Sequence, residues 1–162
     1  MSSKADFTDS DWETLRRGPM VAGMAITFAD PGGPIEVLKE TSSVLRFVTA
    51  ESAAREDLVG EIARDVRALA QQRKNPLGDF KPRGSLAGKE ILDELSGGAE
   101  IVTEKGTPEE AEAFRAWLLE CAKHAAEAAK EGGFMGFNAV RVSEGEERML
   151  AELAKTLGVA PD

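Results

Sequence analysis

The residues of this sequence best suited to chemistry are acidic side chains in two glycine-rich corners, at 29–36 and 132–147. They are Asp30, Glu36, Glu146 and Glu147, with Glu40 one helical turn beyond Glu36. Ca²⁺ and Mg²⁺ are bound by several oxygen ligands that converge from short loops. If the two corners meet in space, these carboxylates form a candidate divalent-metal site. The same side chains also suit the first turns of helices, where they favour the positive end of the helix dipole. Both interpretations stay open at this point.

Cys121 and His124 are three residues apart, a spacing that places two side chains on one side of a helix. A structural zinc site needs four Cys or His ligands, however, and this chain has one of each. Cys121 also falls on an apolar stripe, so we expect it to be a small buried hydrophobic residue. We find no nucleophile elbow and no phosphate-binding glycine motif. The sequence therefore predicts neither an enzyme nor a resident cofactor.

A third set of candidate residues is apolar: Phe134, Met135 and Phe137 lie in the glycine-rich connection before the last predicted helix. Connections normally run over the wet surface of a protein, so two rings and a thioether are unusual there. They either fold back over the end of the core or contact a partner, since aromatic and methionine side chains are common interface anchors.

The composition narrows the class of protein. The chain has 162 residues, a net charge of −9 and a pI near 4.8, which argues against nucleic acid as its main partner. Its single cysteine suits a reducing compartment. The first residues resemble neither a signal nor a transit peptide. The longest apolar stretch, from Met20 to Ala29, is about half the ~20 residues needed to cross a bilayer. We therefore expect a protein of the cytoplasm.

Helix-forming residues dominate, and start and stop signals divide the chain into about seven helices. We expect these at 8–18, 20–29, 34–48, 52–73, 85–105, 107–131 and 143–157, with a break or kink at Gly97-Gly98. The longest loop is 75–84. We expect one all-α domain over 1–162, with flexible tails at 1–6 and 159–162. The two glycine-rich corners have similar patterns, which suggests a bundle with pseudo-two-fold halves.

Three segments resemble the tellurite-resistance TerB-like group of small bacterial proteins. They are Phe7-Thr8 through Trp12 and Leu15 to Ala29-Asp30; Pro108-Glu109-Glu110-Ala111-Glu112-Ala113-Phe114; and Gly133-Phe134-Met135-Gly136-Phe137 leading into Val142-Ser143-Glu144. The resemblance implies an all-helical fold and, for some members, acidic residues proposed to bind divalent metal. This chain departs from the group at both corners: prolines and an insertion follow Asp30, and Asn138 and Ala139 stand where an acid is expected.

Two functional hypotheses follow. The first is a non-enzymatic protein-binding or regulatory module of a bacterial cytoplasm, which contacts another protein or its own copy through Phe134, Met135 and Phe137. The second is a TerB-like stress-response protein that binds a divalent metal through Asp30, Glu36, Glu146 and Glu147.

Overall fold

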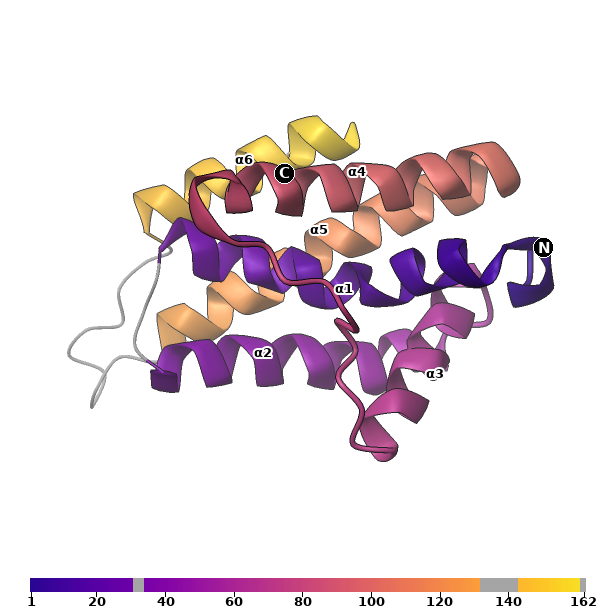
Figure 1. Ribbon diagram of the computed structural model, residues 1–162, viewed down its shortest axis with the longest axis horizontal. Helices are drawn as coiled ribbons and strands as arrows, with labels where there is room; N and C mark the ends of the chain where they lie inside the picture. Colours follow the sequence, from indigo (N-terminus) through magenta and orange to yellow (C-terminus); the bar gives the residue numbers. More distant parts are fainter. Residues whose placement is uncertain (31–33, 132–142, 161–162) are drawn as a thin grey trace.

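The computed structural model describes the backbone of residues 1–30, 34–131 and 143–160, and their side chains apart from those of 34–36 and 129–131 (Figure 1). Within these ranges the chain forms six α-helices and three 3-10 helices, and no strand. The α-helices are α1 (Asp9–Ala29), α2 (Pro34–Thr49), α3 (Leu58–Gln71), α4 (Ala87–Lys105), α5 (Pro108–Glu131) and α6 (Glu144–Leu157). The 3-10 helices are η1 (Lys4–Asp6), η2 (Ser52–Ala54) and η3 (Gly84–Leu86). The expected all-α fold is confirmed, with six α-helices instead of about seven.

Capping boxes start three of these helices, as the sequence predicts. The pairs are Thr8 with Asp11, Thr107 with Glu110, and Ser143 with Glu146. In each pair the hydroxyl oxygen accepts from the backbone N–H three residues on, and the carboxylate accepts from the N–H of the capping residue. Two N–H groups that the helix leaves without partners are thereby satisfied.

The predicted end of a helix at Gly18-Pro19 is wrong, because α1 runs unbroken from Asp9 to Ala29 with Pro19 inside it. A proline within a helix removes one hydrogen bond and costs about 3 kcal/mol. Apolar residues before and after it, among them Trp12, Leu15, Val21 and Ile26, are nevertheless buried in one core. Burying a large apolar side chain contributes about 1.5–3 kcal/mol. The packing on both sides therefore outweighs the local break signal.

Two other predicted helix boundaries also need correction. The helix expected from Ser52 starts at Leu58, after the 3-10 turn η2, with Asp57 as its cap. The expected break at Gly97-Gly98 is absent, since α4 is continuous. Each glycine costs a helix about 1 kcal/mol, but α4 buries a regular stripe of which Gly98 is itself a part: Ile91, Leu95, Gly98, Ala99 and Val102.

Helices α1, α2, α4 and α6 run roughly along one axis, α5 is slanted to them near the centre beside α1, and α3 is steeply inclined (Figure 1). Helices α2, α4 and α6 run antiparallel to α1. The C-terminal end of α1 and the N-terminal ends of those three helices therefore lie at one end of the bundle. Contacts agree with this arrangement: Thr27 on α1 bonds Glu40 on α2, and a side chain on Gly88 of α4 would meet the Phe28 ring. This end of the bundle carries the corner acids.

One apolar core joins all six α-helices. Its two indoles are hydrogen-bonded: Trp12 Nε1 donates to Asp65 Oδ2 at 2.6 Å, and Trp117 Nε1 donates to Ser52 Oγ at 2.8 Å. No helix in the described ranges is long and apolar enough to cross a membrane. Near the N-terminus, Ser2 donates hydrogen bonds to the Glu110 carboxylate. The loop 75–84 crosses α1 between α3 and α4 and packs Leu77 and Phe80 against the core (Figure 1).

Candidate functional site

Two buried carboxylates lie at the end of the bundle where α1, α2 and α6 meet. Glu40 on α2 is only 2% exposed, and one of its carboxylate oxygens accepts a hydrogen bond from the Thr27 hydroxyl on α1. Glu146 on α6 is 4% exposed. Acidic side chains are almost never buried this fully unless they are paired or hydrogen-bonded. We call Thr27, Asp30, Glu40 and Glu146 the acidic corner.

Glycine allows α6 to bring Glu146 into this corner. A Cβ on Gly145 would lie 2.9 Å from the Ala29 carbonyl oxygen, so a side chain there would push the first turn of α6 away from α1. With that turn in place, Glu146 closes the capping box of α6 through the Ser143 N–H, at 3.3 Å.

Electrostatics at the acidic corner favour a proton on Glu146. Burial raises the pKa of the Glu146 carboxyl, the negative charges of Asp30 and Glu40 raise it further, and the hydrogen bond from Ser143 only partly opposes them. Uptake of a proton by Glu146 relieves the repulsion between the carboxylates of this corner.

Among the predicted metal ligands, the structure brings Asp30 close to Glu146. Asp30 is the C-cap residue of α1, and although it is exposed, its charge raises the pKa of Glu146. Glu147 is also exposed and is not among the charges that raise this pKa. The Glu36 side chain lies outside the described residues. Among the side chains that are described, no group of three or more His, Cys, Asp or Glu could hold a metal ion. The described residues therefore do not supply a complete ligand set.

Of the remaining candidate residues, the structure describes Cys121 and His124. Cys121 is fully buried and burial raises its pKa, which confirms the interpretation as a core residue. His124 stacks on Phe47 of α2, with ring centroids 4.0 Å apart and an interplanar angle of 20°. The expected partner contacts Phe134, Met135 and Phe137 lie outside the described residues.

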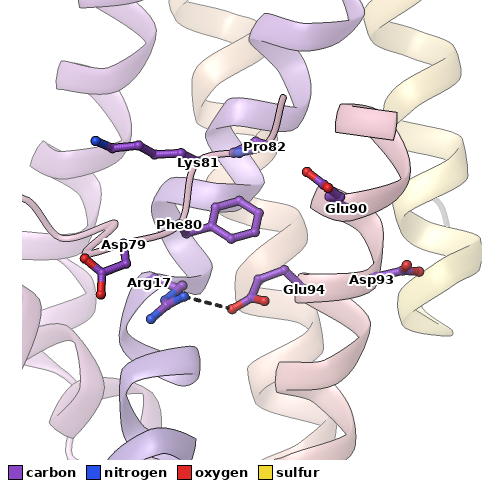
Figure 2. A pocket seen from close by; sticks show the side chains of 8 residues that line it. All are labelled: Arg17, Asp79, Phe80, Lys81, Pro82, Glu90, Asp93 and Glu94. Carbon is purple, nitrogen blue, oxygen red and sulfur yellow. Dashed lines mark ion pairs between the residues drawn. The ribbon is translucent and has the colours of Figure 1, made fainter. Parts of the chain in front are cut away.

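A second feature is a cavity of about 450 Å³ between α1, α4 and the loop 79–82, which we call the α1–α4 cleft (Figure 2). Its lining consists of Arg17, Asp79, Phe80, Lys81, Pro82, Glu90, Asp93 and Glu94. Arg17 on α1 and Glu94 on α4 form an ion pair across it, with Arg17 Nη1 and Glu94 Oε1 3.6 Å apart. Figure 2 shows the Phe80 ring pointing from the loop into the space above this pair.

A third feature is a cavity of about 380 Å³ along the outer side of α2, beside the C-terminal half of α5. We call it the α2–α5 groove. Its lining consists of Leu38, Lys39, Ser42, Ser43, Arg46 and Ala128. Leu38 is 66% exposed. Apolar spacing in the sequence predicts an inward face of Ile35, Leu38, Leu45 and Val48 on this helix. Val48 is buried and Leu45 packs partly buried against the core, but the prediction is wrong for Leu38, and Glu40 and Val44 complete the buried stripe.

Sequence reasoning missed Glu40 as a buried residue for the same reason. Apolar spacing places Leu38 inward, and a charged residue in the stripe gives no apolar signal. The spacing of Glu40, Val44 and Val48 is regular at four residues, so a search that tolerated one acid per helix face would have found it. Nothing in the sequence joins Arg17 to Glu94, because they lie on different helices.

Comparison with known proteins finds no matching family model, no matching curated protein and no matching solved structure.

Proposed function

We propose that this protein is a non-enzymatic protein-binding module of a bacterial cytoplasm, and that the α2–α5 groove is one of its contact surfaces. The observation that carries the proposal is Leu38, which is 66% exposed at the groove beside two cationic side chains. A single exposed leucine is ordinary on a protein surface. An exposed leucine in a groove that also carries two cationic side chains is unusual in a chain of net charge −9.

The charges of the groove favour a partner segment that carries acidic side chains. Lys39 and Arg46 are both exposed, and neither forms an ion pair within the described part of the chain. Complementary charge steers association and selects partners. We therefore expect a partner segment with both acidic and apolar side chains, most simply an amphipathic helix laid along α2 with an apolar residue against Leu38.

The connection between α5 and α6 extends this proposal. Phe134, Met135 and Phe137 follow α5, which forms one wall of the groove, and we retain them as expected partner contacts. The pseudo-two-fold relation between the two corners also remains part of the proposal, since it predicts related contact surfaces at both corners.

The test is site-specific photo-crosslinking with p-benzoylphenylalanine in cells of the native host. The crosslinker is placed at Leu38 and, as a matched control, at Glu104, an exposed residue of α4. We expect a discrete crosslinked species at position 38 that is absent at 104. The combined substitution Lys39→Glu and Arg46→Glu removes that species, because reversed charges repel an acidic partner. Both cations are exposed, so thermal melts should match the wild type.

Three results bear on this test. A crosslinked species at twice the mass of the chain identifies a second copy as the partner. Equal labelling at 38 and 104, or a species that survives charge reversal, contradicts the proposal.

A second candidate is divalent-metal binding at the acidic corner, as the TerB-like resemblance implies. The burial of Glu40 and Glu146 beside Asp30 favours it, and a complete ligand set requires Glu36. Ca²⁺, Mg²⁺, Mn²⁺ and Zn²⁺ are titrated by calorimetry and thermal melts. A melting temperature that rises in the wild type and not in Glu146→Gln supports this function; no heat and no stabilisation with any of the four ions rejects it.

A further inference from the structure

We propose that the α1–α4 cleft binds an organic cation, namely an ammonium or guanidinium group carried on an apolar stem. This inference is independent of the α2–α5 groove and of the acidic corner, because it uses none of their residues. It rests on three features of the cleft: an unsatisfied carboxylate, an apolar wall and an excess of negative charge.

The carboxylate is Glu94. Its Oε1 atom is buried and accepts no hydrogen bond from any described residue. The nearest cation is Arg17, whose Nη1 atom is 3.6 Å away, beyond hydrogen-bonding distance. Arg17 is also shared with Glu13 on its own helix, at 3.7 Å. The Glu94 side chain as a whole is 22% exposed. A carboxylate with one distant, shared counter-charge retains capacity to accept hydrogen bonds from a second cation, and such charged hydrogen bonds are strong.

The apolar wall comes from the loop. Phe80 and Pro82 line the cleft opposite α4, and Phe80 is half-buried against the core. The face of an aromatic ring attracts ammonium and guanidinium groups, and its edges pack against methylene groups. The volume of about 450 Å³ falls within the usual range for small-ligand cavities. A ligand with a short aliphatic stem therefore finds an apolar surface beside the carboxylates.

The charge of the lining selects a cation over an anion. Four carboxylates and two basic side chains line the cleft. Lys81 points away from Phe80 and Glu94 in Figure 2. Asp93 also points away and pairs with Lys89. Asp79 lies on the other side of Arg17 from Glu94 in Figure 2. The acceptors beside the ring are therefore Glu94 and Glu90, and Glu90 also accepts a hydrogen bond from the Arg83 backbone N–H at 3.3 Å. The net charge of −9 adds a long-range attraction for cations.

The test is isothermal titration with agmatine, which combines a guanidinium group, an aliphatic stem and an ammonium group. A blocked glycyl-arginyl-glycine peptide is titrated in parallel, and the tighter ligand shows whether the cation comes from a free amine or from a protein side chain. We expect saturable 1:1 binding of at least one of them, weakened by added salt.

Charge-removing variants locate the site. Glu94→Gln and Glu90→Gln should each weaken binding by about tenfold, as expected for the loss of one hydrogen bond to a charged group. Glu104→Gln is the matched control, since Glu104 is an exposed carboxylate of the same helix that does not line the cleft, and this variant should bind as the wild type does. Glu90 is exposed, so Glu90→Gln tests the site even if Glu94→Gln lowers the melting temperature.

Several results overturn the proposal. They are the absence of saturable binding of either ligand to the wild type, equal weakening by Glu104→Gln and Glu94→Gln, and wild-type affinity in both Glu90→Gln and Glu94→Gln. Equal weakening would mean that the cation responds only to the diffuse negative charge of the protein.

Discussion

At the scale of single residues, Glu146 combines a structural role with an electrostatic cost. Its carboxylate closes the capping box of α6, and at the same time it is buried beside Asp30 and Glu40. The first role requires only an oxygen acceptor, whereas the second penalises the negative charge. A neutral side chain of the same shape should therefore serve α6 better than glutamate does at neutral pH.

We predict that Glu146→Gln raises the melting temperature at pH 7.5. Glutamine keeps the acceptor for the Ser143 N–H and removes the buried charge. Because folding raises the pKa of Glu146 above its ordinary value of 4.5, the stability contributed by its protonated form is complete below that value and is lost as the pH rises through the folded-state pKa. The gain in the variant should accordingly shrink toward zero near pH 3.5. Thermal melts across this range measure it.

The control for this prediction is Glu147→Gln, a change at the exposed neighbour that should alter the free energy of unfolding by no more than about 0.5 kcal/mol. A Glu146→Gln variant less stable than the wild type at pH 7.5 would show that the charge itself, and not only the acceptor, stabilises α6.

At the scale of the helices, the sequence predicted the starts better than the interiors. Caps at Thr8, Thr107 and Ser143 are local signals, since the residues that make each bond lie three apart. Interior breaks at Gly18-Pro19 and Gly97-Gly98 were also predicted from local signals, but there the outcome depends on packing between helices. The predicted inward face of α2 is correct at Val48 and wrong at Leu38 for a related reason, because only tertiary contacts show that Glu40 is buried and Leu38 is exposed.

Two glycines test this view of the helices. Gly97 lies inside α4, and no atom lies within 4 Å of the position that its Cβ would occupy. Gly97→Ala should therefore raise the free energy of unfolding by about 1 kcal/mol. A Cβ on Gly60 of α3 would lie 1.9 Å from the Arg55 carbonyl oxygen, so Gly60→Ala should lower that free energy by about 1–3 kcal/mol. Urea denaturation measures both changes.

These two variants serve as controls for each other, because the same substitution has opposite predicted signs at the two positions. Destabilisation by Gly97→Ala would indicate that α4 bends at Gly97-Gly98, as its sequence suggests. Tolerance of Gly60→Ala would indicate that the turn between η2 and α3 can move.

At the scale of the whole molecule, one core explains what the sequence could and could not predict about function. Composition and periodicity were sufficient for an all-α protein, and the corner acids were identified as candidates. The burial of Glu40 and Glu146 could not be predicted, because it depends on how α1, α2 and α6 pack together. The α1–α4 cleft was also missed, since Arg17, Phe80 and Glu94 come together only when the loop 75–84 packs across α1.

We predict a single cooperative unfolding transition, because all six α-helices contribute to one core. Trp12 lies on α1 and Trp117 on α5, and both are buried. Tryptophan fluorescence and far-ultraviolet circular dichroism should therefore give the same midpoint in urea. Two separate midpoints would contradict this expectation and would support independent halves joined by the loop 75–84.

The burial of Cys121 makes the reaction rate of its thiol a measure of how often the core opens. The sequence contains one thiol, it is 0% exposed in α5, and burial raises its pKa, so the folded state should resist alkylation and disulfide exchange. Its reaction with a thiol reagent then requires the helices around α5 to separate, and the rate reports how often they do so under native conditions. A cysteine introduced on the surface would label alone, which makes the unmodified chain a ready background for single-site spectroscopic probes.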